Sequence, residues 1–199
     1  MRVLGIDPGS RVTGWGVVEE RGGALRHVGS GTIALGPTGA LTARLSRLHA
    51  ECVALLTRFV PEAVVLERAF VARNVQSALR LGEARGAVVA AVGATAVPLH
   101  EYAPAAVKLA TCGHGLADKG SVARGIALRL ALSEVPASDA ADALALALCH
   151  LARVPLARAL GRAAAIDGTP AVATRKRGGR AGARARGSWA GVRTRGGWL

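Results

Sequence analysis

The chain has 199 residues, of which 51% are hydrophobic and 20% are charged. This length and apolar content suit one domain of ordinary size, with a core that needs no disulfides to support it. The longest apolar runs, such as AVVAAV near residue 90, are too short to cross a bilayer, and VLGI near the start is too short for a secretory signal. We therefore expect a cytoplasmic protein with no membrane partner.

Charge is the strongest signal in the composition. Lys and Arg number 26 against 13 Asp and Glu, a net charge of +13 that suits a polyanionic partner such as nucleic acid. Eight of the basic residues lie in the Gly/Ala/Arg-rich stretch 171–199, which has too few large apolar side chains to form a core. We expect residues 158–199 to be a disordered tail that serves either as a solubilising appendage or as a DNA tether.

The three cysteines, Cys52, Cys112 and Cys149, are odd in number and have neither metal-ligand nor redox spacing. We expect them to be reduced thiols, as in other proteins of a reducing compartment.

Residues 1–157 have the pattern of one α/β domain. Two β-like runs, 1–6 and 13–19, flank a Pro-Gly-Ser turn, and a third strand is expected at 30–35, which together predict an antiparallel meander. Apolar residues at steps of three and four predict a helix over 40–59, which Pro61 ends. The continuous apolar run AVVL at 63–66 predicts a strand that is buried on both faces.

The second half of the domain is expected to be mainly helical. We predict a helix over 74–92, a strand over 97–102, and two helices that begin near Pro104 and Lys119. A last helix is predicted to start at Ser138, which is a suitable N-cap residue. No internal repeat is visible in the sequence.

Four acidic residues stand where a predicted strand ends or the last helix begins: Asp7, Glu67, Asp139 and Asp142. The last two are three residues apart and so share one helix face. Ligands of α/β sheets gather beyond the carboxyl ends of central strands, so these acids are candidates to converge. Carboxylate oxygens suit Mg²⁺ or Mn²⁺, and two such ions about 4 Å apart would hold the attacking and leaving oxygens of a phosphodiester during hydrolysis.

Each acid also has an ordinary explanation. Asp7 precedes Pro-Gly and can be an Asx-turn residue, Glu67 can pair with Arg68 or Arg73, and Asp139 can complement the helix dipole. Asp142 is harder to explain in this way, because it stands in the apolar segment DAADALALALCH, where an unpaired carboxylate is costly.

Two histidines near these acids have ordinary explanations too. His150, two helical turns after Asp142, is expected to be a partly buried structural histidine, since metal-binding histidines need companions at close spacing. His114 lies in the segment GHG, which on its own is a weak phosphate-loop signal. The sequence leaves open whether either histidine assists catalysis.

Six segments occur in an order that resembles the RuvC family of Holliday junction resolvases: GIDPGSRVTGWGV, VVLERAF, NVQSALRLGEARG, HEYAPAAVK, GHGLADK and DAADALALALCH. The resemblance covers nearly all of residues 1–155. It implies a ribonuclease H-like fold with a mixed five-stranded sheet. It also implies a homodimeric, Mg²⁺-dependent endonuclease that nicks two symmetric strands of a four-way DNA junction during recombination and repair, leaving 5′-phosphate ends. The partners that it implies are the RuvA and RuvB branch-migration proteins.

The resemblance also assigns roles by position. It makes the four acids the catalytic residues that bind two Mg²⁺ ions, for which Mn²⁺ can substitute: Asp7, Glu67, Asp139 and Asp142. It matches further residues with DNA contacts, of which the aromatic one would stack on bases and the basic ones would bind phosphate: Phe70, Arg73, Lys108 and Lys119. The basic tail after about residue 162 has no counterpart in the family pattern.

Three other functions fit part of this sequence. A general ribonuclease H-like DNA or RNA nuclease would use the same acids, and junction selectivity rests on the resemblance alone. A sugar-kinase or actin-like ATPase also begins with a strand followed by Asp-x-Gly, but it needs two related domains, and about 155 residues leave no room for the second. A non-catalytic DNA binder would not need all four acids.

Overall fold

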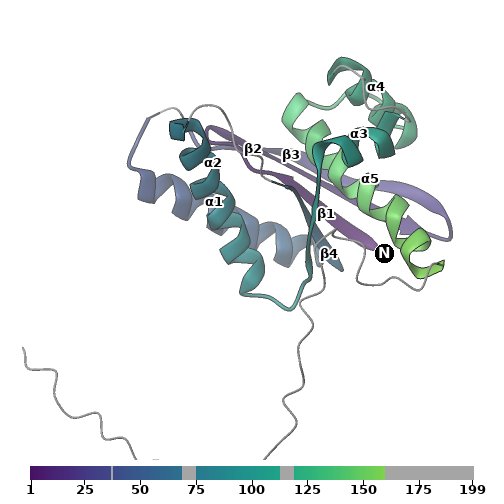
Figure 1. Cartoon of the computed structure of the whole chain (residues 1–199), viewed down its shortest axis with the longest axis horizontal. Coiled ribbons are helices and arrows are strands. Elements are labelled where there is room, and N and C mark those ends of the chain that lie inside the picture. The colour runs from purple at the N-terminus through teal and green to yellow at the C-terminus, as the bar shows by residue number, and fades with distance from the viewer. Residues whose placement is uncertain (37, 69–74, 113–118, 160–199) are drawn as a thin grey trace, which may run out of the picture.

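The structure is a computed structural model that describes residues 1–36, 38–68, 75–112 and 119–159. Its centre is a five-stranded sheet with the strand order β3-β2-β1-β4-β5 (Figure 1). The strands are β1 (Arg2–Asp7), β2 (Val12–Arg21), β3 (Ala24–Ala34), β4 (Ala63–Glu67) and β5 (Leu99–Tyr102). Strands β1, β2 and β3 form the expected antiparallel meander, whereas β4 pairs parallel to both β1 and β5.

Strand β3 is longer than the sequence pattern predicted. It starts at Ala24 instead of residue 30, directly after the two-residue turn Gly22-Gly23, in which both glycines have a positive φ. Such a two-glycine turn matches the right-handed twist of a hairpin and lets the strands pair immediately. The pairing register shifts between Val17 and Val18, which marks an irregularity in the ladder. Strand β3 is at the edge of the sheet and most of its residues are partly exposed, so its sequence lacks the alternation of apolar and polar residues on which the prediction depended.

Helices cover both faces of the sheet (Figure 1). Helices α1 (Leu41–Phe59) and α2 (Val75–Gly93) lie on one face. Helices α3 (Pro104–Cys112), α4 (Lys119–Arg129) and α5 (Ser138–Ala159) lie on the other. Helix α1 ends as expected before Pro61, where Val60 takes a left-handed conformation with φ 44°. No helix in the described part of the chain is both long and apolar enough to cross a membrane.

The core has two halves because side chains alternate along each strand. In β1, Leu4 and Ile6 pack with α1 and α2, while Val3 packs with α4 and α5. The four residues that precede Glu67 in β4 are all fully buried, as expected for a strand covered on both faces. Two residues beyond Gly5 and Val65, the same alternation turns Asp7 and Glu67 toward the α5 face.

Helix α5 lies unusually close to the sheet. A Cβ built on Gly5 would lie 2.0 Å from the carbonyl oxygen of Ala143, and one built on Gly14 would lie 1.9 Å from the carbonyl oxygen of Asp139. Any larger residue at either position would push the helix away from β1 and β2. The two glycines therefore set the height of α5, and of its acidic first turns, above the strand ends.

The described cysteine side chains agree with the expectation of reduced thiols. Cys52 and Cys149 are both free and fully buried. Burial raises the pKa of the Cys52 thiol to about 12 and also raises that of Cys149. Neither side chain is therefore in the exposed thiolate form that redox chemistry needs. Helix α5 continues through Ala159, so residues 158 and 159 of the expected tail are helical, and the rest of the tail, from residue 160, lies outside the described residues.

Candidate active site

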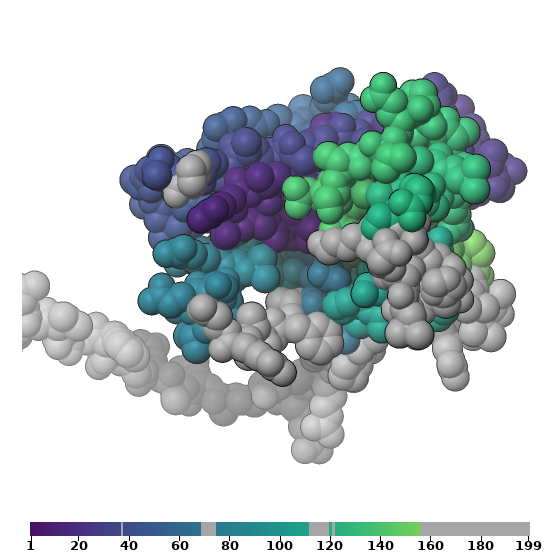
Figure 2. Space-filling view, turned by 90° about the horizontal axis from the view of Figure 1, so that it is seen from above, coloured from purple at the N-terminus to yellow at the C-terminus, as the bar shows by residue number. Residues whose placement is uncertain are grey.

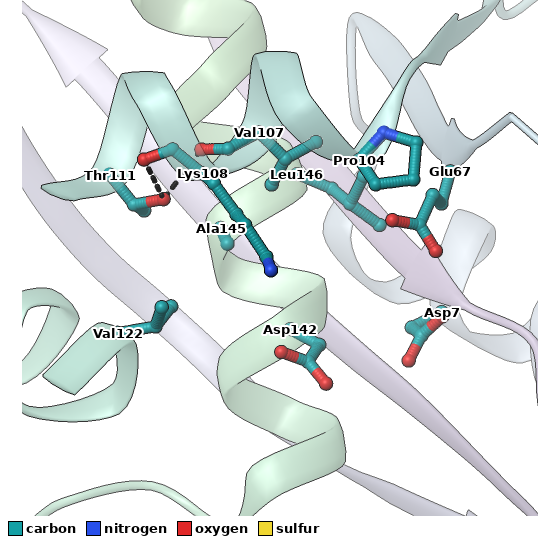
Figure 3. A pocket seen from close by; sticks show the side chains of 10 residues that line it. All are labelled: Asp7, Glu67, Pro104, Val107, Lys108, Thr111, Val122, Asp142, Ala145 and Leu146. Atoms are coloured by element: carbon teal, nitrogen blue, oxygen red, sulfur yellow. Dashed lines mark hydrogen bonds between the residues drawn. The ribbon is translucent and has the colours of Figure 1, made fainter. Parts of the chain in front are cut away.

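The two strand-end acids come together through the parallel pairing of β1 and β4. Ile6 is the register partner of Leu66, so the next residues, Asp7 and Glu67, follow side by side at the carboxyl ends of neighbouring central strands. Both line a cavity of about 230 Å³, and their carboxylates face a common space with that of Asp142 (Figure 3). The predicted convergence of these three acids is therefore present in the fold.

Asp142 reaches the cavity from α5, which crosses over β1. It lies on the side of the helix that also carries Ala145 and Leu146 into the cavity wall. Its side chain is half-buried, as the apolar sequence around it indicated. A carboxylate in such a position needs a compensating partner, and the two other carboxylates of the cavity add to the negative charge that must be balanced.

Asp139 stands one helical turn earlier and is not among the residues that line the cavity. Its main-chain carbonyl packs against Gly14, and Gly14 is the register partner of Asp7. Asp139 therefore lies over the strand next to Asp7, at the edge of the acid cluster. The structure brings three of the four predicted acids into one cavity and places the fourth beside it.

The chemistry of these residues fits a divalent metal ion. Carboxylate oxygens are the ligands that Mg²⁺ prefers, and a cation among them would relieve their mutual repulsion. Among the described residues, no group of three or more His, Cys, Asp or Glu side chains is already arranged to hold a metal ion.

Lys108 is the predicted DNA-contact residue that the structure places at the cavity. It extends from α3 with its ammonium group toward the acids, although most of the side chain is exposed (Figure 3). Lys119 is the first residue of α4, but its side chain is outside the described part of the structure. Phe70 and Arg73 also lie outside the described residues.

A second cavity, of about 200 Å³, lies on the α2 side of the same acids. Asp7 and Glu67 line it together with Arg68 and Arg85. Figure 2 shows the face on which purple residues from the start of the chain reach the surface between teal residues of α2 and green residues from the last part of the described chain. The two strand-end acids therefore stand between two cavities, each of which also has a basic wall residue.

Sequence reasoning missed Arg85. Its Nη1 donates a hydrogen bond of 2.8 Å to the main-chain carbonyl of Glu67, which is 18 residues earlier in the chain. Its Nη2 donates to the carboxylate of Glu101, with which it forms an ion pair. No spacing rule connects residues that are brought together only when α2 packs on the sheet, and no other signal in the sequence marks this arginine.

His150 has the structural role that the sequence predicted, and it is more deeply buried than expected. Only 1% of it is exposed, and its Nδ1 is 2.8 Å from the hydroxyl of Tyr102. Its ring centroid is 4.5 Å from that of His100. Burial, assisted by the charge of His100, lowers the pKa of His150 to about 4. His150 lines neither of the two cavities, and His114 lies outside the described residues.

Comparison with known proteins agrees with the geometry. The family model described as Crossover junction endodeoxyribonuclease RuvC matches residues 3–150. The crossover junction endodeoxyribonuclease RuvC of Alkalilimnicola ehrlichii is 49% identical over 164 residues, which are 82% of this chain and 99% of that protein.

Solved structures give the same result. RuvC of Thermus thermophilus, in complex with a Holliday junction substrate, is 36% identical with a TM-score of 0.72, over 78% of this chain and 96% of that one. The yeast mitochondrial Holliday junction resolvase shares the fold, with a TM-score of 0.58 at 15% identity over 79% of this chain and 83% of that one. The expected ribonuclease H-like architecture and the family resemblance are thus confirmed, and the chain belongs to the RuvC family of crossover junction endodeoxyribonucleases.

Proposed function

We propose that this chain is a metal-dependent endonuclease that resolves four-way DNA junctions by two symmetric nicks during recombination and repair. One observation carries the proposal: in a chain of the RuvC family, Asp7, Glu67 and Asp142 line a single cavity with Lys108 beside them. The Thermus thermophilus relative that was solved with a Holliday junction substrate supports a junction as the DNA that this chain acts on.

We infer that the four acids bind the metal. Asp7, Glu67 and Asp142 would supply carboxylate oxygens from three separate elements, and Asp139 would add its side chain from the first turn of α5. When bound, a pair of Mg²⁺ ions supplies Lewis acidity at the scissile phosphodiester. Mn²⁺ prefers the same oxygen ligands and should substitute. The carboxylates would hold the ions, and the ammonium group of Lys108 would bind a phosphate oxygen on which charge develops.

We propose that further residues around the cavity bind DNA. Phe70 and Arg73 follow Glu67 by three and six positions in the sequence, and Lys119 begins the helix whose Val122 lines the cavity. Phe70 would stack on bases, and the two basic residues would contact phosphates. The part of the tail beyond α5, residues 160–199, would add salt-sensitive attraction to DNA of any sequence.

The outer face of α2 supports a homodimer. Val75, Leu79 and Val89 are 71%, 61% and 37% exposed. Between them, Gly82 and Gly86 have nothing within 4 Å of a built Cβ. These residues repeat at steps of three and four, which forms an apolar seam opposite the buried face of the helix. Glycines in such a seam let a second helix approach closely. We propose that a second copy of the chain packs here, so that the dimer carries the two active sites that two nicks require.

The remaining partners follow from the family. We propose that the chain works with the branch-migration proteins RuvA and RuvB on junctions, and that it does so in the cytoplasm, where bacterial DNA is found.

The decisive experiment is a cleavage assay on a synthetic four-way junction with each strand labelled in turn. A linear duplex of the same sequence, Mg²⁺ and a chelator provide the comparisons. We expect paired nicks at symmetry-related positions, in the junction only and with Mg²⁺ only. Equal cleavage of the duplex would instead make the chain a general nuclease, and junction binding without cleavage would reduce the acids to a structural role.

Light scattering tests the dimer. The wild-type chain should have the mass of two copies, and Leu79→Glu should shift it toward one copy because a charge would be buried in the seam. Leu128→Glu is the matched control, since Leu128 is 85% exposed on α4 and lies outside the seam. A wild-type monomer that makes paired nicks at full rate would contradict this part of the proposal.

A further inference from the structure

Arg85 links three elements at the edge of the acid cluster. It lies on α2 with a side chain that is 17% exposed, and it reaches both the end of β4 and the middle of β5. One nitrogen of its guanidinium group donates to the main-chain carbonyl of Glu67 at 2.8 Å, and another donates to the carboxylate of Glu101. The planar guanidinium group can hold both partners at once in a fixed direction, which a lysine ammonium group does not do.

The carbonyl of Glu67, which Arg85 binds, lies where the pairing between β1 and β4 ends. The parallel register between β1 and β4 ends with the pair Ile6 and Leu66, because β1 turns away after Asp7 at Pro8. Glu67 is the next residue of β4, so it lies one position beyond the last pair on its β1 side. On the other side, the main-chain N–H of Arg68 donates to the carbonyl of Tyr102 at 2.8 Å. Arg85 thus binds the main-chain carbonyl of Glu67 at the position just beyond the end of the pairing between β1 and β4.

Glu101 fixes the arginine in turn. It stands on β5 between His100 and Tyr102, and alternation along the strand directs it to the α2 side, away from His150. The ion pair with Glu101 restricts the guanidinium group to one orientation and partly balances its charge. The result is a chain of contacts from Glu101 through Arg85 to the backbone of Glu67.

We infer that Arg85 is a positioning residue for metal binding: by holding the Glu67 peptide, it directs that carboxylate toward Asp7 and Asp142. The inference rests on the proposed function, since it concerns the metal that the acids bind. Arg85 lines the second cavity, on the α2 side of Asp7 and Glu67, and is absent from the lining of the cavity that Asp142 shares. It therefore acts through Glu67 and not by touching the reacting phosphate.

The chain contains a matched control for this test. Arg2 makes the same pair of contacts at the opposite end of the sheet, with Nη1 donating to the carbonyl of Phe59 at 2.7 Å and Nη2 pairing with Glu19 at 3.1 Å. Arg2→Met and Arg85→Met thus remove the same chemical group and the same kind of contacts. They differ in whether the contacted carbonyl belongs to a proposed metal ligand.

The test measures Mn²⁺ binding to the full-length chain without DNA, by titration calorimetry. We expect Arg85→Met to raise the Mn²⁺ dissociation constant about 10-fold, the usual size for the loss of a group that orients a ligand. We expect Arg2→Met to leave it unchanged. In single-turnover junction cleavage, Arg85→Met should need a correspondingly higher Mg²⁺ concentration for half-maximal rate, with unchanged junction affinity. Its rate should recover at saturating Mg²⁺.

Thermal unfolding shows whether each variant is folded. If Arg85→Met does not fold, Glu101→Gln decides, because it removes only the charge that fixes the arginine; a weaker Mn²⁺ affinity is then expected, and an unchanged one overturns the inference. A folded Arg85→Met with wild-type Mn²⁺ affinity also overturns it, and so does an equal loss in Arg2→Met. A wild-type chain that neither binds Mn²⁺ nor cleaves junctions would overturn the proposed function itself.

Discussion

The two ends of strand β1 have different arrangements of charged groups. At its start, the N-terminal ammonium group lies 3.7 Å from Oε1 of Glu62, and Nη2 of Arg2 lies 3.1 Å from Oε1 of Glu19. At its other end, Asp7 shares a cavity with two more carboxylates from β4 and α5. Oppositely charged groups form ion pairs at the start of β1, whereas three carboxylates of like charge line the cavity at its end.

The difference separates structural charge from functional charge. The ion pairs at the start of the strand balance their own charges, whereas carboxylates that face one another repel each other and are stabilised by a nearby cation. Two of the basic residues that line the cavity walls at the acid end, Lys108 and Arg85, come from helices on opposite faces of the sheet. Four substitutions or conditions test this comparison.

The largest effect is expected from Asp7→Asn. Loss of one metal-binding carboxylate should lower the single-turnover rate of junction cleavage at least about 1000-fold, while fold and junction binding remain. Glu62→Gln makes the same chemical change at the other end of the sheet, and its cleavage rate should equal that of the wild type. Native cleavage by Asp7→Asn would show that this aspartate is only a turn residue.

The next largest effect is expected from Gly5→Ala. The added methyl group would overlap the carbonyl oxygen of Ala143, so α5 must move and the free energy of unfolding should fall by about 3 kcal/mol. Cleavage should fall as well, because the shift separates Asp142 from the strand ends. Urea denaturation measures the stability. Gly125→Ala in α4 has its nearest neighbour at 3.9 Å and should instead stabilise the protein by about 1 kcal/mol. Equal changes in the free energy of unfolding for the two substitutions would contradict the close packing of α5 against Gly5.

Acid should destabilise the protein through His150. Its pKa of about 4 in the folded protein lies below the value of 6.5 in the unfolded chain. As the pH falls below 6.5, the unfolded chain therefore binds a proton that the folded protein does not, and the free energy of unfolding decreases until about pH 4, by up to about 3 kcal/mol. Urea denaturation between pH 7.5 and 4.5 should show this decrease in the wild type. If His150→Gln retained the same slope, another group would be responsible.

The smallest effect is expected from Lys108→Met. Removal of the ammonium group from the cavity wall should lower the cleavage rate about 10-fold, or about 1.4 kcal/mol of transition-state stabilisation, with little change in junction affinity. Arg58→Met removes a cation from α1 on the opposite face, and it should cleave at the native rate. A loss confined to junction affinity would assign Lys108 to DNA binding alone.

Local patterns in the sequence predicted much of the fold. Apolar spacing identified α1, the run AVVL identified β4, and Ser138 marked the first residue of α5. These elements depend on neighbouring residues, so periodicity and capping are sufficient to find them. Strand β3 was predicted to start six residues too late, because its pairing from Ala24 depends on the tight glycine turn and on β2.

The candidate site divides in the same way. Asp7, Glu67 and Asp142 could be predicted to converge, because strand ends and a helix start bring residues to the same edge of a sheet. The role of Arg85 could not, since its contacts join residues 16 and 18 positions apart through the packing of α2. The place of Asp139 beside the cavity depends on how α5 packs against Gly14, which no local pattern encodes.

Because α5 packs on β1 and β2 but comes much later in the chain, the cavity forms late during synthesis of the protein. Asp7 leaves the ribosome 135 residues before Asp142. At ordinary bacterial translation rates that interval is on the order of 10 s. Until α5 docks on the glycines of β1 and β2, the strand ends lack their third carboxylate and the cavity lacks one wall. The three carboxylates therefore share one cavity only after α5 has been made and has packed on the sheet.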